Sequence, residues 1–234
     1  MKNIKLFLLL FLPFVFTGCE YDNFDEPEAT ISGKVVYEGQ TIYVKNNQVT
    51  FRLYEPGWEL SASTYMNVQV AQDGTFNASV YSGKSYRLIR QDNIGPWVNP
   101  TASDTIFIDK CKKKEVVEMQ VTPYYLLTNT NISNSGRIVS GSCSVREVAG
   151  GRKIEYVGLY AGRNIIVDNA YNFGSATTAA VAGDQVLLQV DLSGLAVNST
   201  ANSFPSTGVF YARLGLKIEG IDAMIYTEPV RLSN

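Results

Sequence analysis

The strongest constraint on the fold is an alternation of apolar and polar residues that begins at Ala29 and recurs in short stretches along the chain. Successive side chains of a β-strand point to opposite faces, so a period of two predicts strands with one buried face. Turn residues separate the stretches, and Gln72-Asp73-Gly74 is the strongest hairpin signal among them. Residues 29–121 are therefore predicted to form one β domain, with a polar loop at Gln40–Asn47 and strands at Ile31–Tyr37, Val49–Tyr54, Met66–Val70, Phe76–Val80, Tyr86–Leu88, Ile106–Ile108 and Val116–Val121.

A second β domain is predicted over residues 122–234. The boundary lies at Val121-Thr122-Pro123-Tyr124, where one apolar run ends at a proline and another begins. About seven strands are expected here, a number typical of an immunoglobulin or fibronectin-type sandwich, with loops at Ser175–Gly183 and Ser193–Ser206. The fold class predicted for the chain is all-β, with two β-sandwich domains. The expected strands of the second domain are Tyr124–Asn129, Arg137–Val148, Lys153–Tyr160, Asn164–Tyr171, Gln185–Leu192, Val209–Glu219 and Met224–Leu232.

Residues 1–18 have the organisation of a secretory signal peptide. Lys2 and Lys5 precede an apolar run, Leu6–Phe16, that is too short to span a bilayer as a stable helix. The run leads to Thr17-Gly18-Cys19, which resembles the bacterial lipobox, although Phe16 stands where that box usually has leucine. The resemblance implies that Cys19 is acylated and becomes the new N-terminus, so that a lipid anchor on Cys19 attaches the protein to a membrane.

Residues 19–28 form an acidic tether between the predicted anchor and the first strand. Glu20, Asp22, Asp25, Glu26 and Glu28 lie in it without a basic residue. One interpretation is a solvated spacer that repels itself and extends. The other, which we favour, is that it resembles the surface-export signal of Bacteroidetes lipoproteins, and the two are compatible. The expected location is the outer membrane, exposed at the cell surface, with the periplasmic face left as the alternative.

Composition excludes several classes of function. The sequence contains no histidine, which rules out Ser-His-Asp and Cys-His catalysis and the histidine-containing zinc hydrolase motifs. Beyond the tether the charges almost balance, so nucleic acid is not an expected partner. A glycosidase needs two facing carboxylates, and nothing in the sequence pairs any two of them. No enzyme activity, metal site or cofactor is predicted.

Two cysteines remain once Cys19 is assigned to the anchor. Cys111 and Cys143 fall in different predicted domains, with no spacing typical of a metal site. An exported protein can form disulfides, but two unpaired and partly buried thiols are expected here.

Short motifs in the first domain resemble the carboxypeptidase-regulatory-like module, a small transthyretin-like β-sandwich without catalytic residues. The motifs are Ile31–Val36, Val49–Leu53, Asp73–Phe76 and Gly83–Leu88, in that order. Further motifs are Asp22–Thr30, Gly95–Trp97, Asp104–Ile106, Val121–Tyr124 and Phe210–Arg213. With Ile31–Val36 and Asp73–Phe76 they give the mature chain as a whole a resemblance to two-domain surface lipoproteins of Bacteroidetes, in which an immunoglobulin-like domain follows this module. Such families accompany starch-utilisation-type glycan importers and have no assigned activity. The resemblance implies polysaccharide and glycan-importer proteins as partners.

The two tryptophans, Trp58 and Trp97, lie in loops that contain proline and glycine. Exposed aromatic rings in loops are suited to stacking on sugars, and nearby amides and carboxylates can bond the hydroxyl groups. The alternative, which we weigh more heavily, is that both rings cap the core or fill the seam between the domains. Further aromatic residues are Tyr43, Tyr65, Tyr81 and Tyr171. The candidate ligand residues are Trp58, Trp97, Tyr54, Glu59 and Asn93.

Two functions are therefore expected to compete. The first is a non-catalytic outer-membrane lipoprotein that binds glycans for a polysaccharide-uptake system. The second is a structural or docking lipoprotein that contacts protein partners at the cell surface.

Overall fold

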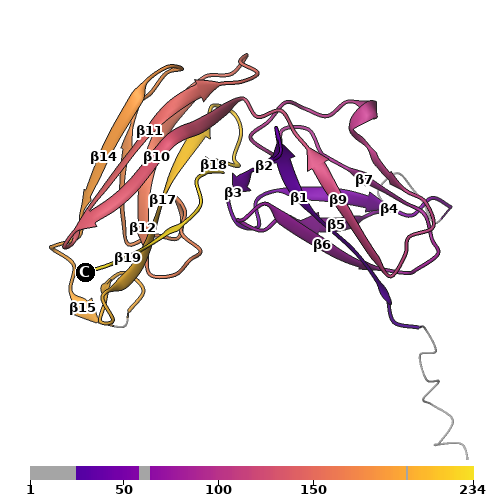
Figure 1. The fold of residues 1–234 in the computed structure, drawn as a ribbon, viewed down its shortest axis with the longest axis horizontal. Helices are drawn as coiled ribbons and strands as arrows, with labels where there is room; N and C mark the ends of the chain where they lie inside the picture. Colours follow the sequence, from indigo (N-terminus) through magenta and orange to yellow (C-terminus); the bar gives the residue numbers. More distant parts are fainter. Residues whose placement is uncertain (1–24, 58–63, 199) are drawn as a thin grey trace, which may run out of the picture.

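The computed structural model describes residues 25–57, 64–198 and 200–234, and within them the chain forms two β-sandwiches that lie side by side (Figure 1). The prediction of an all-β chain with two sandwich domains is confirmed. Cys19, Trp58 and Glu59 lie outside the described residues. Within the described part of the chain, no helix has both the length and the apolar character needed to cross a bilayer.

The N-terminal sandwich is built around β1 (Ala29–Tyr37), which follows residues 25–28 directly. β1 is antiparallel to β6 and β2 and parallel to β9, so neighbouring strands flank it on both sides. The opposite sheet has the order β5-β4-β7-β8. The bounds are β2 (Gln40–Thr41), β4 (Thr50–Tyr54), β5 (Met66–Gln69), β6 (Thr75–Val80), β7 (Tyr86–Ile89), β8 (Ile106–Ile108) and β9 (Lys114–Gln120), with a short 3-10 helix at Ala102–Asp104.

Aromatic rings from both sheets meet in the core of this sandwich. Phe51 of β4 and Phe76 of β6 pack edge to face, with ring centroids 5.3 Å apart. Gly33 of β1 makes room for them, because a Cβ there would lie 2.2 Å from the carbonyl oxygen of Val117 and 2.5 Å from the Phe76 ring. A larger residue at position 33 would clash with β6 and β9, the neighbours of β1 in the same sheet.

The C-terminal sandwich packs a three-stranded sheet, β10-β11-β14, against a larger sheet built on β12 and β17. β17 (Val209–Ile218) is the long strand that alternation predicted, and Phe210, Leu214 and Leu216 are fully buried on its apolar face. The other bounds are β10 (Tyr125–Ser135), β11 (Ile138–Glu147), β12 (Ile154–Gly162), β13 (Gly174–Thr178), β14 (Gln185–Asp191), β18 (Ile225–Tyr226) and β19 (Val230–Ser233).

The strand predicted at Asn164–Tyr171 is wrong, because this stretch is a loop. The fully buried Asp168 turns the chain there: its Oδ1 accepts hydrogen bonds from the backbone N–H groups of Ala170 at 2.7 Å and Tyr171 at 2.9 Å. Such local side-chain bonds compete with strand pairing. The strand comes later, as β13, which occupies part of the predicted loop Ser175–Gly183.

Two further predicted segments are subdivided. The strand expected at Met224–Leu232 is two strands, β18 and β19, and Pro229, which has no N–H group to donate, directly precedes β19. The loop expected at Ser193–Ser206 contains a short parallel pair, β15 (Val197–Asn198) and β16 (Phe204–Pro205).

The segment Gln40–Asn47, predicted to be a polar loop, contributes a strand to the other domain. β3 (Tyr43–Val44) pairs with β18 through Tyr43–Tyr226 and Val44–Ile225 and so extends the large C-terminal sheet. Buried apolar residues form one continuous cluster through both sandwiches. The prediction failed because the partner of β3 lies more than 180 residues away in the sequence. The two domains therefore share a sheet as well as a core.

Arg213 of β17 lies beneath this junction and is the bulkiest fully buried side chain in the described part of the chain. Its guanidinium carbon is 3.8 Å from the centroid of the Tyr226 ring, and its Nη2 donates to the carbonyl oxygen of Val44 at 3.4 Å. Burial lowers the pKa of Arg213 to about 10, so the group keeps its charge at neutral pH. A stacked, buried cation thus connects β17, β18 and β3.

Cys111 and Cys143 are free and buried, which confirms the expectation of unpaired thiols. Burial raises the pKa of Cys143 to about 11, so this thiol stays protonated at neutral pH and is a weak nucleophile.

We expect the C-terminal half alone, residues 124–234, to melt at a lower temperature than residues 25–234. The isolated half loses the pairing of β3 with β18 and the apolar cover of Val44. Circular dichroism melts measure the difference. The control is the longer chain cut at an engineered protease site beside Pro123, which keeps the interface and loses only the covalent link. Equal melting temperatures for the half and the intact chain would contradict a shared sheet that stabilises both domains.

We expect Arg213→Ala to lower the free energy of unfolding by about 3–5 kcal/mol, since it opens a cavity and leaves the buried Asp168 without its nearby cation. Arg231→Ala, on the exposed side of β19, is the matched control and should change that free energy by about 0.5 kcal/mol or less. Urea denaturation measures both. Similar small losses in the two variants would rule out a structural role for the buried cation.

Candidate functional site

Two adjoining surfaces lie at the end of β4, next to the segment that contains Trp58 and Glu59, two of the ligand residues predicted from the sequence. One is a pocket between the sheets of the N-terminal sandwich, and the other is the outer face of the sheet β5-β4-β7-β8. The chain is described up to Gly57 and again from Thr64, and Thr64 and Glu55 both line the pocket. The two surfaces therefore share the β4–β5 end of the domain.

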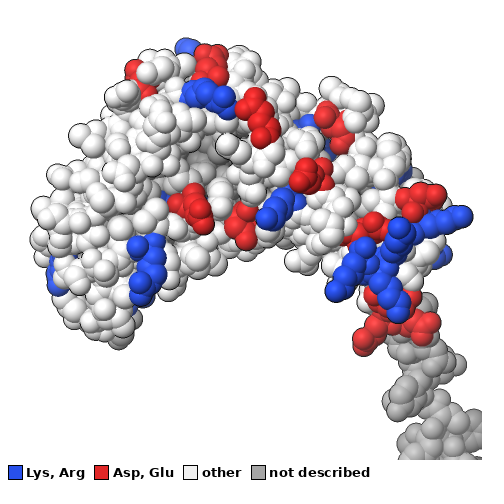
Figure 2. Space-filling model, in the orientation of Figure 1, with Lys and Arg blue, Asp and Glu red and all other residues white. Residues whose placement is uncertain are grey.

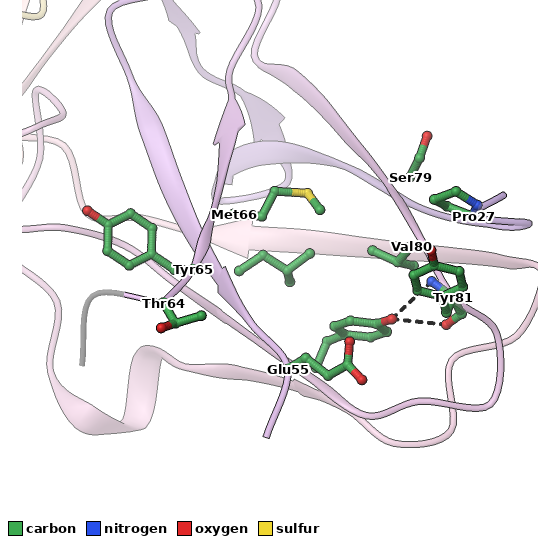
Figure 3. A pocket seen from close by; sticks show the side chains of 10 residues that line it. Pro27, Glu55, Thr64, Tyr65, Met66, Ser79, Val80 and Tyr81 are labelled. Carbon is green, nitrogen blue, oxygen red and sulfur yellow. Dashed lines mark hydrogen bonds between the residues drawn. The ribbon is translucent and has the colours of Figure 1, made fainter. Parts of the chain in front are cut away.

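The inner pocket has a volume of about 290 Å³ and is mainly apolar. Leu53, Met66, Val80 and Tyr86 form its walls, and Figure 3 shows Pro27 and Tyr81 at one end and Glu55 at its edge. The Glu55 carboxylate is 3.9 Å from the ammonium group of Lys84. The pocket is thus a small apolar slot with one carboxylate beside it.

Tyr86 fixes one end of the inner pocket. Its hydroxyl donates to the carbonyl oxygen of Tyr81 at 3.1 Å and accepts from the backbone N–H of Tyr81 at 3.0 Å (Figure 3). Burial raises the pKa of Tyr86, so the phenol remains a donor at any physiological pH. The backbone that carries the exposed Tyr81 ring is therefore held in place.

Tyr65 lines the inner pocket together with its neighbours Thr64 and Met66, but its ring turns toward Tyr54 and Arg52 on the outer face of the sheet. Figure 3 shows its ring pointing away from Met66 and Val80. This follows from strand alternation, because Leu53 and Val68 point inward and Tyr65 and Tyr54 point to the outer face.

Register aligns four side chains across the outer face of this sheet. Leu53 pairs with Met66, which brings Tyr54 beside Tyr65, with ring centroids 5.6 Å apart. Tyr54 pairs with Arg87 on β7, and Arg87 pairs with Phe107 on β8. We call this set the outer row: Tyr65, Tyr54, Arg87 and Phe107. At about 4.8 Å between strands it extends roughly 14 Å, enough for more than one sugar ring.

Cation–π contacts hold the outer row. The Arg52 guanidinium carbon lies 4.3 Å from the centroid of the Tyr65 ring, and that of Arg87 lies 5.5 Å from the centroid of the Tyr54 ring. Phe107 is 71% exposed, an unusual position for a large aromatic side chain on a sheet. The outer row offers aromatic rings for stacking, and the guanidinium group of Arg52 beside it can donate hydrogen bonds to hydroxyl groups.

Tyr54, which the sequence predicted as a ligand residue, therefore lies on this surface. Phe107 also lies there but was not among the predicted ligand residues. A signal for Phe107 existed: Ile106 and Ile108 flank it in a short strand, so an inward-facing pair leaves Phe107 on the wet face. Tyr65 was noted in the sequence only as one of several spare tyrosines.

The prediction of Trp97 as a stacking residue is wrong. The indole is 2% exposed, and the backbone around it bonds to the link between the domains through Val98 N–H to the Thr122 carbonyl oxygen at 2.9 Å. Gly95 lies against the ring, since a Cβ at Gly95 would be 2.1 Å from an indole carbon. Trp97 fills the seam beside the domain boundary, which was the alternative weighed from the sequence.

Asn93 lies on the same side of the seam and already has a protein partner. Its Oδ1 accepts a hydrogen bond from Nη2 of Arg152 in the C-terminal domain at 2.6 Å, and its backbone N–H donates to Asn99 Oδ1 at 2.9 Å. A ligand role for Asn93 stays a prediction, and the contact observed is one between domains.

No group of three or more His, Cys, Asp or Glu residues is placed to hold a metal ion in the described ranges.

Two protein-family models match the chain in succession. Residues 29–122 match the model described as "Protein of unknown function (DUF3823) N-terminal domain", and residues 125–231 match "Domain of unknown function (DUF3823_C)". No curated protein matches the chain.

Several solved structures share the fold over nearly the whole chain. A DUF3823 family protein from Parabacteroides merdae is 31% identical, with a TM-score of 0.77 and coverage of 89% of this chain and 100% of that one. A DUF3823 family protein from Bacteroides ovatus is 24% identical, with a TM-score of 0.74 and coverage of 88% and 98%. A protein from Bacteroides uniformis described as a "putative carbohydrate binding protein" is 16% identical, with a TM-score of 0.68 and coverage of 89% and 100%.

Proposed function

The chain belongs to the DUF3823 family, and from that premise we propose that it is a non-catalytic carbohydrate-binding protein whose binding surface is the outer row. The observation that carries the proposal is the alignment of the half-buried Tyr65 and Tyr54 with the exposed Phe107 across the outer sheet face. Sugar rings have apolar C–H faces that stack on aromatic rings, while their hydroxyl groups need donors and acceptors close by. Arg52, whose guanidinium carbon lies 4.3 Å from the centroid of the Tyr65 ring, supplies donors beside these rings.

Two further points support this proposal. The Bacteroides uniformis protein with the same fold is described as a "putative carbohydrate binding protein", which agrees in ligand class. The absence of histidine from the sequence removes the most frequent general base, and the family descriptions name no activity, so binding without catalysis is the simpler role.

The proposed location is the outer membrane at the cell surface, through acylation of Cys19. Residues 25–28 are exposed and lead directly into β1 at the end of the N-terminal sandwich (Figure 1), and Pro27 and Glu28 still contact the body there. A protein held in this way would keep bound polysaccharide near an importer in the same membrane.

A docking role is the second candidate, and the inner pocket is the observation that favours it. Its walls of Leu53, Met66, Val80 and Tyr86 are suited to an apolar side chain of a protein partner better than to a sugar. Binding of glycans to the outer row would not exclude such a contact.

We expect Tyr65→Ala and Phe107→Ala each to weaken glycan binding about tenfold, a loss of about 1.4 kcal/mol, because each removes one stacking surface. Affinity gel electrophoresis against plant and host polysaccharides measures the change. Phe107→Ala should leave the melting temperature almost unchanged, because the ring is exposed. Tyr81→Ala is the control, since this exposed tyrosine lies at the inner pocket. Loss of binding in Tyr81→Ala alone would move the site to the pocket, and no binding by the wild type would favour docking.

We expect Cys19→Ala to release the protein from membranes, since a buried acyl chain contributes about 0.8 kcal/mol per CH₂ group and a lipoprotein carries several chains. Detergent phase partitioning of cell fractions measures the release, and Cys111→Ala is the control that keeps the predicted anchor. Membrane retention of the Cys19→Ala protein at the wild-type level would refute acylation as the anchor.

A further inference from the structure

A groove of about 510 Å³ lies between the two domains, apart from the outer row. The N-terminal wall includes Lys34, Tyr43 and the turn at Gln72–Asp73, and the C-terminal wall includes Ile165–Ile166 and Glu228. Acidic and basic side chains mix along the concave side of the molecule where the two sandwiches meet (Figure 2). Ligand sites favour such junctions, because neither domain alone forms the concave surface.

The C-terminal wall of this groove is fixed by buried hydrogen bonds. Asp168 turns the loop that carries Ile165 and Ile166, and the Tyr226 hydroxyl accepts the backbone N–H of Asn169 at 3.1 Å. From the other domain, Gln72 Nε2 donates to the carbonyl oxygen of Ile165 at 2.9 Å. The loop therefore spans the junction and is held by both sides. The groove is preformed, which reduces the entropy lost when a ligand binds.

Both hydrogen-bond donors and hydrogen-bond acceptors line this groove. Tyr43, Asp73 and Glu228 line the groove together. Burial, then the carboxylates of Glu228 and Asp73, raise the pKa of Tyr43, so the phenol stays a donor. Lys34 adds an ammonium donor. Gln72 is 9% exposed, and its Oε1 has no hydrogen-bond partner within the described residues. Ile165 and Ile166 are exposed despite their apolar side chains.

We propose that the groove between the domains is a second carbohydrate subsite, which takes a neutral oligosaccharide. Asp73 and Glu228 accept hydrogen bonds from sugar hydroxyl groups, Lys34 and Tyr43 donate to them, and Ile165 and Ile166 contact the apolar ring face. Two carboxylates against one ammonium group disfavour uronic acids and other anionic sugars. The ligand class rests on the proposed function, whereas the location rests on the groove alone.

The test is a titration of ¹⁵N-labelled residues 25–234 with cellohexaose, xylohexaose, mannohexaose and maltohexaose, followed by amide chemical shifts. We expect at least one neutral hexasaccharide to shift the amides of Tyr43, Gln72 and Ile165, and a hexagalacturonide to leave them unchanged. Shifts of Tyr54, Tyr65 and Phe107 report the outer row separately. Shifts confined to the outer row would overturn the groove as a subsite and keep the proposed function. Shifts confined to the groove would keep the subsite and overturn the outer row as the binding surface.

Variants test whether the side chains of the groove cause these amide shifts. The double variant Asp73→Asn, Glu228→Gln keeps the shapes of both side chains and removes their charges. It should weaken oligosaccharide binding in the groove at least tenfold and leave binding at the outer row unchanged. Asp92→Asn with Glu155→Gln changes the same net charge at exposed positions outside the groove and should bind like the wild type. If no neutral hexasaccharide shifts the groove amides at concentrations up to about 10 mM, or if both double variants behave alike, the proposal is wrong.

Discussion

Pairing of β3 with β18 is the interaction on which the arrangement of this protein depends. A two-residue strand from one domain completes a sheet of the other, and the buried Arg213 stacks on Tyr226 and bonds the Val44 carbonyl beneath it. A slide of one domain past the other would separate the buried Arg213 cation from the Tyr226 ring or the Val44 carbonyl, which is costly for a buried charge. Asn93 with Arg152 adds a polar contact near the domain boundary. The two sandwiches therefore act as one body, and the surfaces that span them are fixed.

Strand positions with a clear period of two were predictable from the sequence. The segments whose structure was predicted wrongly have a common cause. β1, β4 and β17 follow local alternation, which needs no knowledge of their partners. β3 is too short to show a period and is a strand only because β18 lies beside it. The stretch containing Asp168 looks like a strand until its carboxylate is seen to bond the backbone ahead of it. Tertiary context decides both cases.

The candidate site shows the same division between local and long-range information. Tyr54 could be selected from the sequence because it stands near Trp58, one of the two loop tryptophans. Tyr65 and Phe107 could not be selected in this way, because only the strand register brings them into one row with Tyr54. Trp97 looked equivalent to Trp58 in the sequence, and packing against Gly95 places it in the interior. Composition alone does not distinguish a ring that packs inside from one that faces solvent.

The position of β1 has a mechanical consequence. The chain enters the body at Ala29 and at once runs between β6 and β9, with Thr30 N–H bonded to the Lys113 carbonyl oxygen at 3.0 Å. A pull on residues 25–28 acts along the strand, across the perpendicular hydrogen bonds to the antiparallel β6 and the slanted ones to the parallel β9, and loads both sets together in shear. Strands at a sheet edge that are pulled away sideways lose such bonds one after another. A force between the body and residues 25–28 would thus be shared by the bonds of β1 to β6 and to β9.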